Sequence, residues 1–493
     1  MVPRSGLSCN IPDNYRSMKY GLLFLLACCA LGCSPDPVAR SERYQPWAET
    51  LQPTGSPAYL ALGTYAKVLC TAVFESKRQP EEAFRNSGKL ILDAQYHDAT
   101  TFEIDTLHRR ARVMLGDSLA RSATYVGDQG CIIDGHGGLK FTPTEVVSAL
   151  PLADGMFWPM GDLTSPPAMN YDPRLLEQAL QAAFEPRALT AAFLVIHQGN
   201  IIAERYGQGV NMHTQLESWS MGKSLTATLI GRLMQMGKLS LDQRAPVPEW
   251  QRKGDPRGRI TIRHLLNMSS GLRFPAHRDP EVQLPLPLLA HMYIYTDTVN
   301  VFQFAVNRPL EFVPGSTGRY RNCDPLTLGY ILRNTVEAEG RNYWTWPQEE
   351  LFDKIGIRRQ LLETDPYGNF IMTGFDYGTA RNWGRLGLLY LQDGLWQGQR
   401  LLPEGFAEFV STPAPGWEQP VYGGLFWLNR TGELALPRDA YYMAGGGGQR
   451  TIIVPSLDLV VVRMGHSQGS PFVAESLNQA LELIVQALNS AAG

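Results

Sequence analysis

The sequence predicts an α/β protein of the α+β type, with an antiparallel sheet flanked by helices, an all-helical subdomain and a small N-terminal α+β domain. Three observations predict the main part of this fold. Paired apolar runs typical of β-hairpins occur at residues 189–209 and 450–465, and the chain between them has apolar residues at helical spacing. A hydrophobic share of 44% over 493 residues can fill at least one large core.

Charge and motif content exclude several function classes. Lys and Arg total 44 against 47 Asp and Glu, a net charge of −3, and no basic run stands out, so no nucleic-acid partner is expected. The sequence holds no Cys-x-x-Cys or His-Glu-x-x-His motif, and no Lys-Ser/Thr follows the glycine-rich run at residues 445–448. We therefore expect no metal site, no nucleotide site and no other cofactor.

The N-terminus has the pattern of an export signal. An uncharged apolar stretch covers residues 20–32 after Lys19 and would extend only about 20 Å as a helix, too short to cross a membrane. Ala-Leu-Gly-Cys at residues 30–33 resembles a bacterial lipoprotein box, so residues 1–33 are interpreted as a lipoprotein-type signal with lipidation at Cys33. Met18 is a better candidate start than Met1, and Leu25-Leu26-Ala27-Cys28 is a competing box with a shorter apolar stretch before it. An ordinary cleaved signal is the alternative. This interpretation predicts a periplasmic protein of the bacterial cell envelope, held to the membrane by its lipid anchor.

The exported chain divides into four segments. Residues 34–56, rich in Pro, Ser and charge, suit a tether, and residues 57–150 form an accessory α+β domain of unknown role. A Pro- and Gly-rich linker at 151–174 leads into the main domain at 175–493.

Three cysteines lie beyond the signal segment. An oxidising compartment permits one bridge among them. We expect Cys70–Cys131, because both residues lie in short β-like runs, and we expect Cys323 to be a free thiol.

The main domain begins with a hairpin that turns at residues 198–200. An amphipathic helix follows at residues 221–236 and ends at Gly237. The second hairpin covers residues 450–465, and a last amphipathic helix covers residues 472–488.

The first chemical cluster is Ser220-Met221-Gly222-Lys223, at the start of the first helix. Spacing of three residues places both side chains on one helix face, so Lys223 can reach the Ser220 hydroxyl. A serine needs a base to become a nucleophile, and a lysine serves if burial lowers its pKa toward neutrality. Taken alone, the same pattern also fits a helix-capping serine beside a solvated lysine.

Two further clusters accompany the first. Tyr320-Arg321-Asn322 can direct a phenol and an amide into one cleft, the phenol for proton transfer and the amide for binding either a substrate carbonyl or the lysine. The run from Gly445 to Gly448 leads directly into a strand, where glycines let another backbone approach and free an N–H group for an oxyanion. The alternative for residues 320–322 is a surface turn, and the alternative for the glycine run is a flexible loop.

The order and context of these three clusters resemble the serine β-lactamase/penicillin-binding protein superfamily over residues 175–490. The resemblance is to its class C-like branch, which includes esterases and 6-aminohexanoate-dimer hydrolases. The segments at 262–272, 386–405, 422–429 and 445–462 are similar to the same branch. The resemblance implies a β-lactamase/transpeptidase-like fold.

The resemblance also implies roles for individual residues. Ser220 would be the acyl-forming nucleophile, Lys223 its base and Tyr320 the proton relay. The backbone N–H groups of Ser220 and Gly446 would form the oxyanion hole, and Asn322 and Gly445 would contact substrate.

One departure bears on the substrate. The family's third motif usually begins with a cation that can hold a substrate carboxylate, whereas Met443 stands there in this sequence. Because no cation stands at position 443, binding of a β-lactam carboxylate is not expected to be efficient, and neither is β-lactamase activity. Arg450 is the one nearby cation that could replace it. A competing Gly-x-Ser-x-Gly motif at residues 465–469 fails, because neither Asp nor His follows it.

The sequence therefore predicts a serine hydrolase that cleaves a small amide or ester through an acyl-enzyme, similar to 6-aminohexanoate-dimer hydrolases. A penicillin-binding, D-Ala peptidase or β-lactamase activity is the enzymatic alternative. A non-catalytic envelope binding protein is the alternative from another class.

Overall fold

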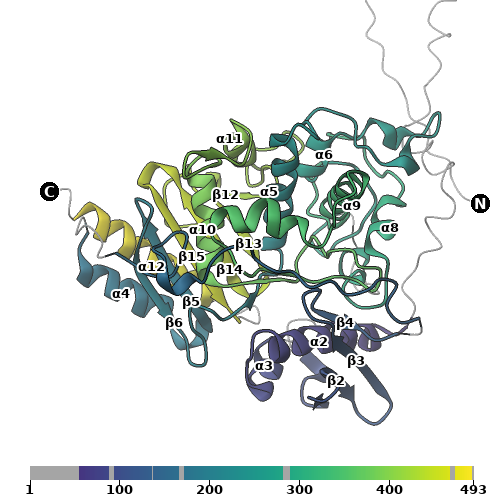
Figure 1. The fold of residues 1–493 in the computed structure, drawn as a ribbon, viewed down its shortest axis with the longest axis horizontal. Coiled ribbons are helices and arrows are strands. Elements are labelled where there is room, and N and C mark those ends of the chain that lie inside the picture. Colours follow the sequence, from purple (N-terminus) through teal and green to yellow (C-terminus); the bar gives the residue numbers. More distant parts are fainter. Residues whose placement is uncertain are drawn as a thin grey trace, which may run out of the picture.

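The structure is a computed structural model that describes residues 55–87, 94–135, 137–165, 171–280, 282, 289–466 and 472–490. The signal segment with Cys33 and nearly all of the tether lie outside these residues. Figure 1 shows a large domain that carries the main sheet and a smaller N-terminal unit beside it.

The N-terminal unit is one long helix packed on a four-stranded antiparallel sheet in the order β1-β2-β3-β4. Its elements are α2 (Pro57–Phe74), α3 (Pro80–Asn86), β1 (Thr100–Asp105), β2 (Arg110–Leu115), β3 (Leu119–Tyr125) and β4 (Cys131–Ile133). Ser56 caps α2, accepting a hydrogen bond from the Tyr59 N–H at 3.2 Å. Among the described residues, α2 alone is long and apolar enough to span a membrane, and 78% of it is buried within the protein, as in a core helix.

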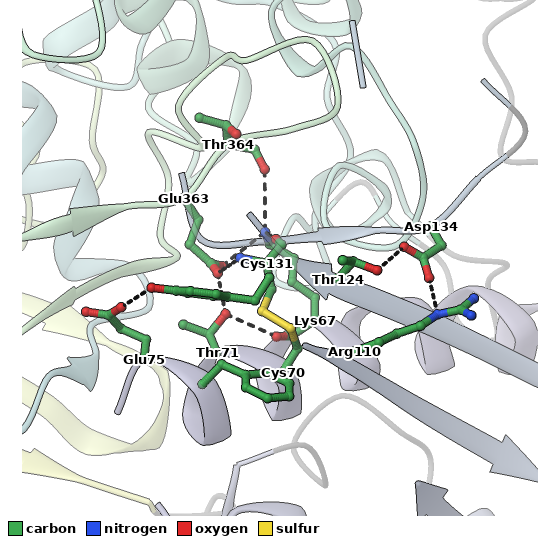
Figure 2. Close-up of a disulfide and its surroundings, with 12 residues drawn as sticks. Lys67, Cys70, Thr71, Glu75, Arg110, Thr124, Cys131, Asp134, Glu363 and Thr364 are labelled. Atoms are coloured by element: carbon green, nitrogen blue, oxygen red, sulfur yellow. Dashed lines mark hydrogen bonds and ion pairs between the residues drawn. A yellow bond between two sulfur atoms is a disulfide. The ribbon is translucent and has the colours of Figure 1, made fainter. Parts of the chain in front are cut away.

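The structure corrects the expected β-like run around Cys70. That run belongs to α2, which continues unbroken from Pro57 to Phe74. A short apolar run has the same appearance in a buried strand and in a buried helix, so its pattern could not distinguish them. Cys70 nevertheless forms a disulfide with Cys131 of β4, with Cα atoms 6.0 Å apart, and thereby joins α2 to its sheet (Figure 2).

The main sheet is antiparallel and has the order β12-β13-β14-β15-β5-β6. Its strands are β5 (Thr190–His197), β6 (Asn200–Tyr206), β12 (Trp427–Leu428), β13 (Tyr441–Gly445), β14 (Gln449–Val454) and β15 (Leu459–Gly465). Strands from opposite ends of the domain meet at its centre, where Val195 pairs with Val461. Both predicted hairpins are present, β5 with β6 and β14 with β15.

Helices cover both faces of this sheet (Figure 1). Leu194 and Val460 face the core that contains α5 (Met221–Gln235) and α10 (Ala380–Leu391), whereas their neighbours Val195 and Val461 face α4 (Pro173–Ala183) and α12 (Phe472–Asn489). This alternation is the two-residue period of a strand buried on both sides.

A mainly helical region lies between the two halves of the sheet. Its helices are α6 (Ile262–Leu266), α7 (Ala290–Tyr293), α8 (Val301–Val306) and α9 (Cys323–Ala338), and α11 (Phe406–Ser411) follows α10. Short strands complete the domain: β7 (Leu216–Glu217), β8 (Leu361–Leu362) and β9 (Asp376–Gly378) form one sheet, and β10 (Leu395–Trp396) pairs with β11 (Gln399–Arg400).

The segment expected to be a linker lies against the main domain in its described part. The Trp158 indole N–H donates to the Gly199 carbonyl at 2.9 Å, and Arg385 Nε donates to the Pro159 carbonyl at 2.6 Å. These contacts fix residues near 158 to the β5–β6 turn and to α10.

Candidate active site

Ser220 and Lys223 meet at the first turn of α5. The Lys223 ammonium nitrogen lies 3.0 Å from Ser220 Oγ, as the spacing of three residues predicts. Ser220 occupies the N-cap position of α5, but its side chain makes no capping hydrogen bond. The alternative of a capping serine is therefore not what the structure shows, and the hydroxyl remains directed to Lys223.

The residue before Ser220 has an unusual backbone. Trp219 has φ of +49°, in the left-handed region that bulky residues seldom adopt. The conformation is held on both sides: Ser218 N–H donates to the Asp376 carbonyl at 2.9 Å, and the Trp219 ring packs 5.3 Å from that of Phe375. This sharp turn places Ser220 at the N-terminus of α5.

Burial makes Lys223 a weak base. Its side chain is 1% exposed, and it donates a second hydrogen bond to the Thr373 carbonyl at 2.8 Å. Desolvation lowers the pKa of Lys223 from 10.5 to about 7, although the nearby Asp376 carboxyl acts in the opposite direction. A lysine with this pKa is partly neutral at pH 7 and can accept a proton.

Tyr320 lies close to both Ser220 and Lys223. The Lys223 nitrogen is 5.0 Å from the centre of its ring, and the Tyr422 and Trp427 rings pack against it at 5.8 and 5.3 Å. Desolvation raises the pKa of Tyr320 to about 12, and a hydrogen bond with Ser220 acts in the opposite direction. The phenol is therefore protonated at neutral pH and able to donate.

The glycine run lies beside Ser220 because no side chain intervenes. A Cβ at Gly445 would overlap the Ser218 carbonyl oxygen, so only glycine lets the end of β13 approach the residues before α5. Gly446 follows Gly445 and lies next to Trp219. Both glycines line the same pocket as Ser220 and Tyr320.

That pocket has a volume of about 450 Å³ and is rich in cationic and imidazole groups. Arg278, His277, His291 and Arg450 line it, with Glu433 as the acidic member. The guanidinium groups of Arg278 and Arg450 both lie close enough to Tyr320 to lower the pKa of its phenol. A larger hollow of about 920 Å³ lies between the N-terminal unit and the main domain, but it contains none of the predicted site residues.

The sequence identified Arg450 but not the other three basic residues. His277 and Arg278 lie outside any helix or strand, and His291 belongs to the four-residue helix α7. No spacing pattern links them to Ser220, so no sequence signal was available to find them.

The Asn322 side chain lies inside the protein, behind Tyr320 and His291. Its side chain is fully buried and donates to the His291 carbonyl at 2.7 Å and to the Tyr295 hydroxyl at 3.1 Å. Asn322 does not line the pocket as described. In this arrangement the amide supports the wall behind Tyr320, and its contact with substrate stays a prediction.

Other candidate groups take no part in this site. The His264 ring and the Thr261 hydroxyl form a capping box at the start of α6. Within the described ranges, no cluster of three His, Cys, Asp or Glu side chains could hold a metal ion. Cys323 is a buried free thiol next to Asp324.

An antiparallel sheet covered by helices, with a serine and a buried lysine at the head of the central helix, defines the class of serine hydrolases with β-lactamase architecture. The beta-lactamase family model matches residues 174–486, and the chain belongs to this family.

Three similar proteins show the range of relatives. An uncharacterized protein from Alkalihalophilus pseudofirmus is 25% identical over 57% of this chain and 85% of its own. A 6-aminohexanoate-dimer hydrolase from Paenarthrobacter ureafaciens is 25% identical over 48% of this chain and 59% of its own length. A solved structure from Bacillus anthracis, provisionally described as a 6-aminohexanoate-dimer hydrolase, superposes with a TM-score of 0.52 at 21% identity, over 70% of this chain and 88% of its own.

Proposed function

We propose that this protein is a serine hydrolase that cleaves a small amide or ester through an acyl-enzyme on Ser220. The observation that carries the proposal is the 3.0 Å contact between Ser220 Oγ and a buried lysine whose pKa is lowered to about 7. Nucleophile and base are thus paired beside an open pocket, in a protein of a family typified by hydrolytic serine enzymes.

The proposed reaction uses the chain's own groups throughout. Neutral Lys223 accepts the Ser220 proton while Oγ attacks the substrate carbonyl carbon. The resulting oxyanion is held by the backbone N–H groups of Ser220 and Gly446. Tyr320 donates a proton to the leaving nitrogen or oxygen and is reprotonated from Lys223. Water then attacks the acyl-enzyme with the same groups acting in reverse, which releases the acid and restores Ser220.

The pocket favours a compact substrate. A volume of about 450 Å³ accommodates a small linear amide or ester, and its aromatic wall includes Tyr442 and Trp427. Arg450 and Arg278 supply positive charge that could face a substrate carboxylate, although Met443 replaces the family's usual cation. The named relative that acts on a 6-aminohexanoate dimer supports small linear amides ahead of β-lactams.

The test is hydrolysis of p-nitrophenyl butyrate by residues 34–493 and by its Ser220→Ala variant. Ser224→Ala is the matched control: Ser224 lies one turn further along α5 and donates to the Leu425 carbonyl rather than facing the pocket. We expect turnover by the parent protein and by the control, and none by Ser220→Ala. Equal rates in parent and Ser220→Ala would refute the assignment, and inactivity of both toward any activated ester would favour a binding protein.

Comparison of substrates then separates the enzymatic alternatives. We expect hydrolysis of the linear 6-aminohexanoate dimer to exceed that of the chromogenic β-lactam nitrocefin. The reverse order would favour the penicillin-binding or β-lactamase alternative.

We also propose that the protein is anchored to the envelope through lipid on Cys33, on the strength of the Ala-Leu-Gly-Cys box. The full chain should partition into the detergent phase of Triton X-114, and Cys33→Ser should partition into the aqueous phase. Partitioning of both proteins into the aqueous phase would favour an ordinary cleaved signal.

A further inference from the structure

The N-terminal unit inserts one charged side chain into the main domain. Lys67 of α2 is 2% exposed, and its ammonium nitrogen lies 3.1 Å from Glu363 Oε2, a carboxylate that is itself 1% exposed (Figure 2). Lys67 also donates to the Cys131 carbonyl. Burying both charges costs free energy of desolvation, which close contact and further hydrogen bonds have to offset.

Glu363 is held by the N-terminal unit from three directions. Its Oε1 accepts hydrogen bonds from the Cys131 N–H at 2.8 Å and from the Thr71 hydroxyl, in addition to the contact with Lys67 (Figure 2). Gly130, with φ of +75°, makes this approach possible, because a Cβ there would overlap the Glu363 carboxyl group. The carboxylate is therefore fixed in position only when the N-terminal unit is docked.

The backbone of Glu363 in turn fixes the segment that holds the catalytic lysine. Glu363 N–H donates to the Phe375 carbonyl at 3.0 Å, and Glu363 carbonyl accepts from the Ile371 N–H at 2.9 Å. These two bonds bracket Thr373, whose carbonyl accepts the hydrogen bond from Lys223.

A second set of contacts runs through Phe375. The Lys67 nitrogen lies 5.4 Å from the centre of the Phe375 ring, on which the Trp219 and Tyr295 rings also pack, at 5.3 and 5.1 Å. Trp219 directly precedes Ser220. Lys223 thus contacts residues 371–376 directly, and Ser220 is linked to them through the preceding Trp219. The Lys67–Glu363 pair contacts the same segment through Phe375 and through the Glu363 backbone.

We propose that Lys67 and Glu363 are positioning residues: by locking residues 371–376, this pair from two different units holds Lys223 within reach of Ser220. The proposal rests on the function proposed above for Ser220 and Lys223. It makes the N-terminal unit a required part of the catalytic site, although none of its residues lines the pocket beside Ser220.

The same interface supplies a matched control. Glu75, at the end of α2, pairs with Arg359 of the main domain at 2.6 and 2.7 Å and is 8% exposed. The Arg359 side chain binds Glu75 and Asp128, and within the part of the chain that the structure describes it makes no hydrogen bond to residues 371–376. Loss of Glu75 therefore weakens the docking of the unit without releasing the segment that holds Lys223.

The experiment compares Lys67→Met, Glu363→Gln and Glu75→Gln by steady-state hydrolysis of p-nitrophenyl butyrate and by thermal unfolding. We expect kcat to fall at least tenfold in the first two variants with KM changed less than twofold, because the pocket is intact while the base is misplaced. Glu75→Gln should keep kcat within twofold despite a similar decrease in Tm. Lys67→Arg keeps the positive charge of the ion pair, so its kcat should be close to that of the parent protein and well above that of Lys67→Met.

A double variant keeps the experiment decisive if a single variant fails to fold. Lys67→Met/Glu363→Met removes both charges, so it avoids an unpaired buried charge if a single variant fails to fold; its kcat should remain low. A kcat in this double variant equal to that of the parent, or a loss in Glu75→Gln as large as in Lys67→Met, would overturn the proposal. Activity that survives Ser220→Ala would instead refute the proposed function, whatever the behaviour of Lys67.

Discussion

Acidification should slow acylation, because it protonates the amine of Lys223. With a pKa of about 7, about half of the protein carries the neutral amine at pH 7 and roughly one molecule in a hundred does so at pH 5. The value of kcat/KM for p-nitrophenyl butyrate should therefore decrease about 50-fold from pH 7 to pH 5 and approach a plateau above about pH 8. A solvent-exposed lysine, with a pKa near 10.4, would give no plateau in this range.

Three ionisable side chains face Lys223 and need to be distinguished from it. The pKa of Tyr320 is raised to about 12, and that of His291 lies well below 6.5, both through burial. Burial raises the pKa of Asp376 to about 7, into the range of Lys223 itself. Because the Asp376 carboxylate raises the pKa of Lys223, Asp376→Asn should move the midpoint to lower pH.

The assay is the initial rate at constant ionic strength from pH 5 to pH 9, with spontaneous ester hydrolysis subtracted. Lys223→Arg is the control, since a guanidinium stays protonated and cannot act as the base, and it should be inactive throughout. A midpoint above pH 9, a flat profile from pH 5 to pH 8, or an inflection that disappears in Asp376→Asn would refute the role of Lys223.

Three further variants test the site and the disulfide of the N-terminal unit. Lys223→Met should stabilise the protein against urea at pH 7 by roughly 1–3 kcal/mol while abolishing activity, because the folded state no longer has to deprotonate a buried lysine; a loss of stability would contradict this account. Gly445→Ala should lower kcat at least tenfold, because its Cβ would overlap the Ser218 carbonyl, and unchanged ester hydrolysis would show that β13 has room to shift. Cys70→Ala/Cys131→Ala should lose about 4 kcal/mol of unfolding free energy in urea, given a separation of 61 residues; an equal urea midpoint in both proteins would argue against a stabilising bridge.

The serine–lysine pair and the main sheet could be predicted because local patterns determine them. Residues three apart in a helix share a face, so the contact between Ser220 and Lys223 depends on little beyond helix formation. Paired apolar runs on either side of a turn likewise predicted both hairpins of the sheet, and the resemblance to a known superfamily predicted how they combine.

Features that depend on tertiary packing could not be predicted. The run at residues 68–74 has an apolar pattern common to buried strands and buried helices, and only its packing against β2 and β3 distinguishes the two. The direction of the Asn322 side chain depends on its hydrogen bond to Tyr295, which no spacing in the sequence relates to it. The Lys67–Glu363 pair joins two units far apart in sequence and has no local signal at all.

The pairing of β5 with β15 also governs when the domain can form. The strand β15 is synthesised long after its partner β5, and α12 is likewise synthesised long after α4, on which it packs. Long-range contacts of this kind slow folding, because a large loop has to close before they contribute free energy. During synthesis the nascent chain therefore carries apolar strands without partners until β15 has emerged. Refolding from denaturant should be slow and sensitive to protein concentration.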